Sequence, residues 1–217
     1  FNCVSQSQQR GFPPCPVLCA PIDNGVPVER LEARHAPRNF ALVLGRVCPE
    51  KGIHLALDAA ALAGTPLLIG GEVFAYEAHQ RYFAEEVRPR LGAGARFLGA
   101  IGFARKRRLL TAARCLLVPS LVAETSSLVA MEALACGTPV VAFPAGALAD
   151  IVEPGVTGFL VEDTGQMAPA IAEAGRLDRT RCRAIARMRF ALDRMVASYL
   201  ALYHELAGPA HRLAAEA

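Results

Sequence analysis

Residues 115–142 read CLLVPSLVAETSSLVAMEALACGTPVVA and contain a pattern of strand, helix and strand. The apolar runs 115–119 and 139–142 have the length of buried strands, and 128–136 has the period of a helix. Two strands that are joined through a helix in this way lie parallel in one sheet. This stretch therefore predicts a βαβ unit whose loops follow the ends of the strands.

The same alternation continues over most of the 217 residues. Further strands are expected at 17–20, 40–45, 66–70, 95–98 and 158–161. Further helices are expected at 52–63, 76–91, 106–113 and 166–174, and the amphipathic stretch 180–206 is expected to form one terminal helix or a helix pair. The pattern predicts an α/β fold with a Rossmann-like, doubly wound parallel sheet in three α/β/α layers.

The composition excludes several classes of protein. With 53% hydrophobic residues, 20% charged residues and a net charge of +3, the chain is neither disordered nor a strongly basic nucleic-acid arm. The basic run 105–108 has no aromatic residues among its cations, so it is interpreted as a solvated helix start. No nucleic-acid partner is expected, and no apolar run approaches the ~20 residues of a membrane span.

The seven cysteines are an odd number and most lie in apolar surroundings, which favours reduced thiols in the core of a cytoplasmic protein. Cys15 and Cys19 are close in sequence, but no second pair of ligands has zinc-finger spacing. No metal site is therefore expected.

Two loops after expected strands carry residues that suit an anion. In the first, Gly45 lets the backbone come close to a ligand. Arg46 can donate hydrogen bonds to two oxygens at once, and Lys51 supplies a point charge near a helix start. A surface turn with two solvated cations explains this loop equally well. In the second, Glu124 and Glu132 lie eight positions apart, and the first amides of the following helix are free to face an anion. A third loop, 143–150, is weaker evidence.

The run from Glu124 to Glu132 resembles the E-x7-E signature of the family-4 glycosyltransferases (glycosyl transferases group 1), which are retaining enzymes of the GT-B fold. Gly45-Arg46 with Glu50-Lys51-Gly52, Val118-Pro119-Ser120 and the segment 151–161 agree with that family in order and spacing. The resemblance covers about residues 24–203. It implies one half of a GT-B fold, namely the C-terminal half that binds a nucleotide-diphosphate sugar.

The resemblance also implies roles for matching residues. Arg46 and Lys51 would hold the diphosphate and neutralise the leaving nucleotide, Glu124 would contact the transferred sugar, and Glu132 would bind the ribose hydroxyls. The other residues expected to contact the nucleotide sugar are Gly45, Leu98, Ala100, Ser126, Ser127, Leu128 and Val129. A UDP-sugar is the first expectation and a GDP-sugar the second, with no cofactor and no metal, because Arg46 and Lys51 would replace one.

Two positions depart from the family's pattern. Ser127 stands where the family usually has Gly, and it is expected to cap the helix and keep its amide for phosphate. Ala147 replaces the second Gly of a Gly-Gly pair. Its methyl group is expected to lie where the donor sugar approaches, and so to alter the choice of sugar or weaken binding.

Three regions are expected. Residues 1–38 would be the end of the N-terminal half, with its last strand and turn at 1–7, and a linker. Residues 39–178 would be the donor domain, and 179–217 a helix or helix pair with a frayed tail. The acceptor-binding half would be a missing part of the same protein or a separate chain, and any contact with a membrane would come only through it. The terminal helix would cross back to that half.

This chain alone is expected to bind the donor without efficient transfer. Two other functions stay open: a non-catalytic nucleotide-sugar-binding module or donor subunit of a split transferase, and a GT-B nucleotide-sugar epimerase. The two glutamates with the 45–52 loop fit transfer better than epimerisation. The sequence does not identify the donor sugar, the base, the acceptor or the oligomeric state.

Overall fold

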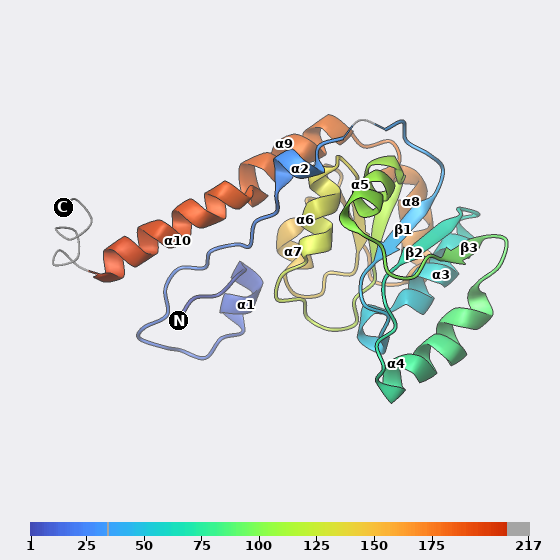
Figure 1. Cartoon of the computed structure of the whole chain (residues 1–217), viewed down its shortest axis with the longest axis horizontal. Coiled ribbons are helices and arrows are strands. Elements are labelled where there is room, and N and C mark those ends of the chain that lie inside the picture. The colour runs from blue at the N-terminus through green and yellow to red at the C-terminus, as the bar shows by residue number, and fades with distance from the viewer. Residues whose placement is uncertain (34, 208–217) are drawn as a thin grey trace.

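A computed structural model describes residues 1–33 and 35–207 of the chain. The tail that is expected to fray, 208–217, lies outside the described residues. The rest of the chain forms a parallel sheet between helices, with one long helix projecting from it (Figure 1).

Six short strands form one parallel sheet in the order β3-β2-β1-β4-β5-β6. They are β1 (Ala41–Leu44), β2 (Leu67–Gly70), β3 (Ala95–Phe97), β4 (Cys115–Val118), β5 (Val140–Ala142) and β6 (Gly158–Leu160). Ala41 of β1 lies opposite Leu67 on one side and Cys115 on the other. The chain runs outward in both directions from this central strand, so a crevice is expected where β1 and β4 end.

The helices follow the strands along the chain. The longer ones are α3 (Ile53–Leu62), α4 (Glu77–Tyr82), α5 (Phe103–Ala112), α6 (Leu128–Ala135), α8 (Thr164–Ala174), α9 (Arg179–Phe190) and α10 (Leu192–Ala207). The shorter ones are α1 (Gln6–Arg10), α2 (Val28–Leu31), α7 (Leu148–Ile151) and three irregular turns of helix, η1 (Pro49–Lys51), η2 (Phe83–Val87) and η3 (Arg88–Arg90).

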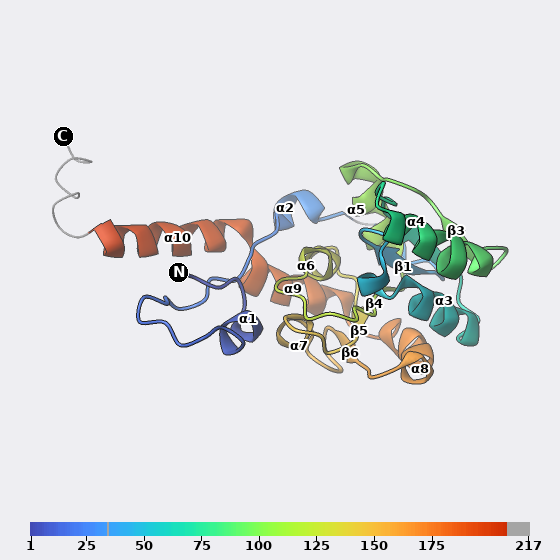
Figure 2. The ribbon, with the colours of Figure 1, turned by 90° about the horizontal axis from the view of Figure 1, so that it is seen from below.

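Two separate cores form on the two faces of the sheet. Leu42, Leu44 and Leu116 belong to a core that includes residues of α6 and α9, whereas Val43 and Leu117 belong to one built with α3 and α8. Figure 2 shows α6, α7 and α9 on one side of the strands and α3 and α8 on the other. The inner strands β1, β4 and β5 are apolar and buried along their whole length because both of their faces are covered, whereas the edge strand β3 carries the exposed Arg96. The expected three-layer, doubly wound sheet is confirmed.

The strand expected at 17–20 is absent, and so is the strand expected at the start of the chain. The apolar run 17–20 lies between Pro16 and Pro21, which lack backbone donors, and Val17 is 62% exposed. Residues 17–22 instead hold the first residues through isolated bonds, among them Cys19 N to Phe1 O at 2.8 Å. The segment 1–7 runs into α1, whose first turn is capped by the Ser5 side chain.

The helix expected at 76–91 is broken into α4, the π-helical turn η2 and the 3₁₀ turn η3. Pro89 cannot donate a backbone hydrogen bond and its ring crowds the preceding turn, so a regular helix cannot run through this position. The break leaves α4 as a short helix beside η1.

The terminal stretch forms a pair of helices that divides at Ala191. There the backbone is extended, because residue 26 inserts between the helices: Val26 N donates to Phe190 O at 2.8 Å and Leu192 N donates to Val26 O at 3.0 Å. No residue of α10 is buried, and this helix projects away from the sheet above the N-terminal segment (Figure 1). No helix among the described residues combines the length and apolar character that a membrane span requires.

Candidate functional site

A cavity of about 290 Å³ opens where β1 and β4 end. Its apolar lining comes from the two strands and the start of α3, including Val43, Leu117, Val118 and Ile53. Its polar groups come from the loops that follow the same two strands. The cavity therefore lies at the reversal point of the strand order, where open parallel sheets bind ligands.

The loop after β1 brings two cations to this cavity. Gly45, Arg46 and Lys51 all line it. Arg46 is exposed and makes no ion pair within the described ranges, so its guanidinium is available to a ligand. Gly52 has φ of 59°, and an added Cβ would lie 2.2 Å from Pro119 O, so only glycine lets this loop pack against the loop after β4.

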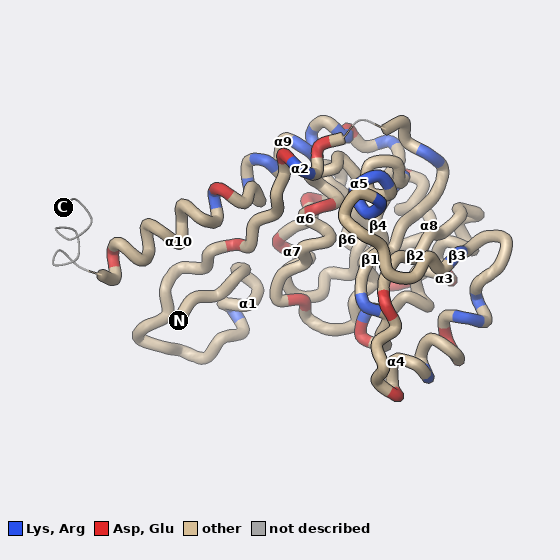
Figure 3. Tube along the Cα trace, viewed as in Figure 1, with Lys and Arg blue, Asp and Glu red and all other residues tan. Residues whose placement is uncertain are grey.

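Lys51 and Glu124 form an ion pair across the cavity, with Nζ and Oε1 2.5 Å apart. The Glu124 side chain is only 11% exposed, so its charge depends on a close partner. Lysine has three donors, and this contact uses one of them. Figure 3 shows a basic stretch of the trace where the chain leaves β1, and an acidic stretch near it on the segment that leads to α4.

The start of α6 supplies uncharged donors to the same cavity. Ser126, Ser127, Leu128 and Val129 all line it. The Ser126 hydroxyl is buried and has no hydrogen-bond partner among the described residues. Ser127 occupies the N-cap position, but its side chain makes no capping hydrogen bond, contrary to expectation. The first residues of α6 thus line the cavity without a side-chain cap, an arrangement that suits an anion.

The third loop supports Glu124 from behind. Gly146 has φ of 63°, Glu124 N donates to Ala145 O at 3.3 Å, and Ala147 N donates to Glu124 O at 2.8 Å. Ala147 itself is 1% exposed and belongs to the core. The expectation that its methyl group meets the donor sugar is wrong for this cavity, because the side chain packs into the core below the loop.

Glu132 lies one turn inside α6 and does not line the cavity. Its Oε1 is 2.5 Å from Lys106 Nζ, and the two side chains are 14% and 27% exposed. The interpretation of 105–108 as a solvated helix start is therefore wrong at Lys106, whose side chain is part of this half-buried ion pair. Sequence reasoning missed Lys106 because its partner is 26 positions away, although a lysine inside an amphipathic helix was a signal.

Leu98 and Ala100, which are expected to lie against the base, follow β3 at the same end of the sheet. They do not line this cavity, since β2 lies between β3 and β1. Of the expected site residues, the structure brings together those of the loops after β1 and β4, and it leaves Leu98, Ala100 and Glu132 outside.

Three side chains of the types that can ligate a metal, Cys48, Glu50 and His79, lie close together in and beside the loop after β1. Burial and a hydrogen bond to Glu50 raise the pKa of the Cys48 thiol. A backbone amide and that same thiol lower the pKa of the Glu50 carboxyl. The seven cysteines are all free.

The family of glycosyl transferases group 1 matches residues 38–175. A D-inositol 3-phosphate glycosyltransferase of Mycobacterium tuberculosis is 35% identical over 177 residues, which cover 76% of this chain and 37% of that protein. The chain thus spans little more than a third of the length of this relative.

Two solved structures share the fold. AviGT4, described as a glycosyltransferase involved in avilamycin A biosynthesis, superimposes with a TM-score of 0.81 at 26% identity, over 95% of this chain and 64% of its own. Alr3699/HepE of Anabaena, solved in complex with UDP and glucose, gives a TM-score of 0.76 at 24% identity, over 92% of this chain and 62% of its own.

Proposed function

The chain belongs to the glycosyl transferases group 1, and from this premise we propose that it is the donor-binding part of a retaining glycosyltransferase. The observation that carries the proposal is the convergence of Arg46, Lys51 and the start of α6 on one cavity at the ends of β1 and β4. Two cations and free amides around a concave site favour a diphosphate. The donor is then a nucleotide-diphosphate sugar.

Arg46 and Lys51 supply the charge that the diphosphate needs. Arg46 is exposed and can fork onto two phosphate oxygens, while Lys51 is held at the inner wall by Glu124. As the bond to the sugar breaks, negative charge grows on the leaving diphosphate, and cations fixed beside it lower that barrier. We assign this neutralisation to the two side chains rather than to a metal.

Glu124 is assigned to the transferred sugar. Its carboxylate is paired with Lys51. A diphosphate would share Lys51 Nζ, whose two other donors are free for phosphate oxygens. The Glu124 oxygens then have capacity for sugar hydroxyls, and the loop 145–147 holds the Glu124 backbone in place while they bind.

Glu132 and Lys106 are assigned to the ribose end of the nucleotide. A carboxylate that is 14% exposed, with a single lysine partner in the described structure, has unused acceptor capacity for the ribose hydroxyls. Binding of ribose here requires the nucleotide to extend from the cavity along α6. Leu98 and Ala100 remain the proposed contacts of the base.

UDP is the first candidate nucleotide and GDP the second. UDP is the nucleotide in the solved complex of Alr3699/HepE, which shares this fold. Acceptor binding is assigned mainly to a further half, in the same protein or in a second chain, and the chain alone is expected to bind the donor without efficient transfer. Retention is tested by the anomeric configuration of the product, read by proton NMR after transfer by the whole protein.

The first experiment measures thermal unfolding of the chain with UDP, GDP, ADP and their common sugar conjugates. A ligand at about 100 times its dissociation constant adds about 2.7 kcal/mol of stability, which gives a clear rise in melting temperature. We expect a selective rise with one nucleoside diphosphate and its sugar conjugates, and UMP as the control without a diphosphate should raise it less. A melting temperature that no nucleotide or nucleotide sugar raises would refute donor binding by this chain.

A further inference from the structure

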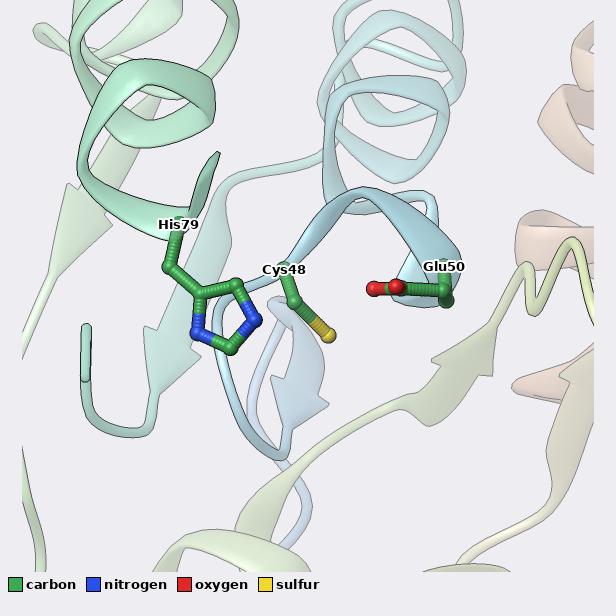
Figure 4. Close-up of side chains that lie close together, drawn as sticks. All are labelled: Cys48, Glu50 and His79. Atoms are coloured by element: carbon green, nitrogen blue, oxygen red, sulfur yellow. The ribbon is translucent and has the colours of Figure 1, made fainter. Parts of the chain in front are cut away.

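A second cluster of reactive side chains lies in and beside the loop after β1, residues 45–52. Cys48 Sγ, a carboxylate oxygen of Glu50 and a ring nitrogen of His79 all lie within 4.8 Å of one another. Figure 4 shows the His79 ring facing the Cys48 sulfur, with the Glu50 carboxylate on the other side of that sulfur. None of the three lines the donor cavity.

The backbone fixes two of these side chains. Cys48 is the N-cap of η1 and is 1% exposed, and its carbonyl accepts from Lys51 N at 3.1 Å. His79 lies in α4, and its ring stands edge-on to Tyr76 with centroids 5.1 Å apart. Glu50 is exposed, so its carboxylate is the mobile member of the three.

The His79 ring is held by aromatic neighbours and presents one nitrogen to the cluster. His79 is 9% exposed and packs against Phe74 and Tyr76. Its Nε2 lies on the side of the Cys48 sulfur, whereas its Nδ1 points away from that sulfur (Figure 4). The Cys48 thiol donates one long hydrogen bond, 3.8 Å to Arg46 O, and its sulfur lies within 4.8 Å of a Glu50 carboxylate oxygen. These buried groups therefore retain capacity for a ligand that binds both sulfur and nitrogen.

We propose that Cys48, Glu50 and His79 form a three-ligand site for a thiophilic divalent cation, with Zn²⁺ as the best fit. Thiolate, imidazole and carboxylate together suit Zn²⁺, whereas Mg²⁺ and Ca²⁺ prefer oxygen alone. Three protein ligands leave a fourth position for water. A Zn–S distance of ~2.3 Å and a Zn–N distance of ~2.0 Å require the ligand atoms to approach one another by about 1 Å. This takes a small rotation of the Cys48 and His79 side chains as well as movement of the exposed Glu50 carboxylate. Binding releases the Cys48 thiol proton to solvent.

The cation would tie three parts of the site together. His79 belongs to α4, and Cys48 and Glu50 belong to the loop that carries Arg46 and Lys51. Glu50 O also accepts from Leu121 N at 2.8 Å, in the loop that leads to Glu124. The metal would therefore hold α4 against the loop after β1. This inference does not depend on the proposed function.

The test is a metal titration of the chelator-stripped chain in a thiol-free reductant. Co²⁺ serves as the optical probe, because a thiolate ligand gives a charge-transfer band in the near ultraviolet, and Zn²⁺ should displace it. We expect one equivalent of Co²⁺ with that band. Cys48→Ser should abolish the band, and His79→Gln should keep a weaker band while raising the dissociation constant for Zn²⁺ by more than about tenfold.

Cys15 and Cys19 provide the matched control, since they are half-buried thiols four positions apart and outside the cluster. The double variant Cys15→Ser/Cys19→Ser should keep the band and the affinity. Circular dichroism checks that each variant is folded. If Cys48→Ser does not fold, the change in affinity of His79→Gln tests the proposal. A band that survives in folded Cys48→Ser, an unchanged affinity in His79→Gln, loss of the band in the control, or no stoichiometric binding by the parent chain would each overturn the proposal.

Discussion

Each of the two glutamates Glu124 and Glu132 is held by a lysine from a distant part of the chain. Glu124 pairs with Lys51 and Glu132 pairs with Lys106. All four side chains are less than about one third exposed, so these contacts are less screened than ordinary surface ion pairs. At the scale of single residues, the proposed site is thus a set of charges held in place before a donor arrives.

Lys51→Ala should weaken the binding of nucleoside diphosphates much more than that of the free nucleoside. The change removes a cation from the cavity and leaves the Glu124 charge without its partner, next to the incoming phosphates. A charge-assisted contact is worth about 1.5–3 kcal/mol, so we expect a loss of roughly ten- to a hundredfold in affinity for UDP, measured by titration calorimetry. Arg176→Ala, which removes an exposed cation paired with Glu173, is the control and should change nothing.

Glu132→Gln should weaken nucleotide binding only where the ribose has its hydroxyls. We expect a tenfold or greater loss for UDP and a much smaller loss for the analogue that lacks both ribose hydroxyls, because the variant and the analogue remove the same contact. The control is Glu173→Gln, at an exposed glutamate of α8. Equal losses for the two ligands would reject the ribose assignment.

At the scale of elements, the site depends on how closely two loops pack. Gly52 and Gly64 have nearly the same backbone conformation, with φ of 59° and 57°. A Cβ at Gly52 would collide with Pro119 O, whereas a Cβ at Gly64 would meet nothing within 4 Å. Substitutions at the two positions should therefore share the free-energy cost of backbone strain, and only the substitution at Gly52 should also push the two loops apart.

Gly64→Ala should cost about 1–2 kcal/mol of unfolding free energy, which is the strain of a left-handed residue with a side chain. Gly52→Ala should cost more, and it should also weaken UDP binding, because the loops that carry Lys51 and Glu124 are pushed apart. Urea unfolding and nucleotide titration of both variants measure this. If Gly52→Ala matched Gly64→Ala in both measurements, loop packing would have no part in the site.

At the scale of the whole molecule, buried thiols make the fold sensitive to alkali. Burial raises the pKa of Cys115 from 9.0 to about 12, and those of Cys136 and Cys182 to about 11. Above pH 9 the thiols of the unfolded chain lose their protons while those of the folded chain keep them, so the unfolded state binds fewer protons. The free energy of unfolding should therefore fall as pH rises from about 9 towards 12.

The expected slope is up to about 1.4 kcal/mol per pH unit for each such thiol. Urea unfolding in a reductant at pH 8, 9 and 10 measures it. Cys115→Ala should make the decline shallower, and Cys15→Ala, at a half-buried position, is the control for losing a thiol outside the core. A decline that is as steep in Cys115→Ala as in the parent chain would contradict this origin.

Prediction from the sequence succeeded where a local pattern decides the structure. All six strands of the sheet are expected from the sequence, because parallel strands between helices are short, mostly apolar runs, even at the edge strand β3 with its exposed Arg96. The strand expected at 17–20 failed because an apolar run between two prolines has the same composition but no sheet edge to pair with. The prediction of one helix over 76–91 was wrong because Pro89 interrupts regular helical hydrogen bonding, although the apolar residues of this stretch have helical spacing.

The sequence predicted which loops carry the candidate site, because that depends only on which residues follow the strands. Gly45, Arg46, Lys51, Glu124 and the start of α6 line one cavity because each follows a strand end, and parallel strands end on the same edge. Lys106 could not be predicted, since its contact with Glu132 depends on how α5 packs against α6. The same holds for Ala147, whose burial depends on the direction of its Cβ.

The sequence by itself determined the α/β class, the six strands and the loops that carry the candidate site, because hydrophobic period and turn residues act over a few positions. Only the tertiary structure decided the pairing of Lys51 with Glu124, the pairing of Lys106 with Glu132, and the cluster of Cys48, Glu50 and His79. These contacts join residues that are 73, 26 and about 30 positions apart. Such distances close only when strand order and helix packing are set, and local periodicity carries no information about either.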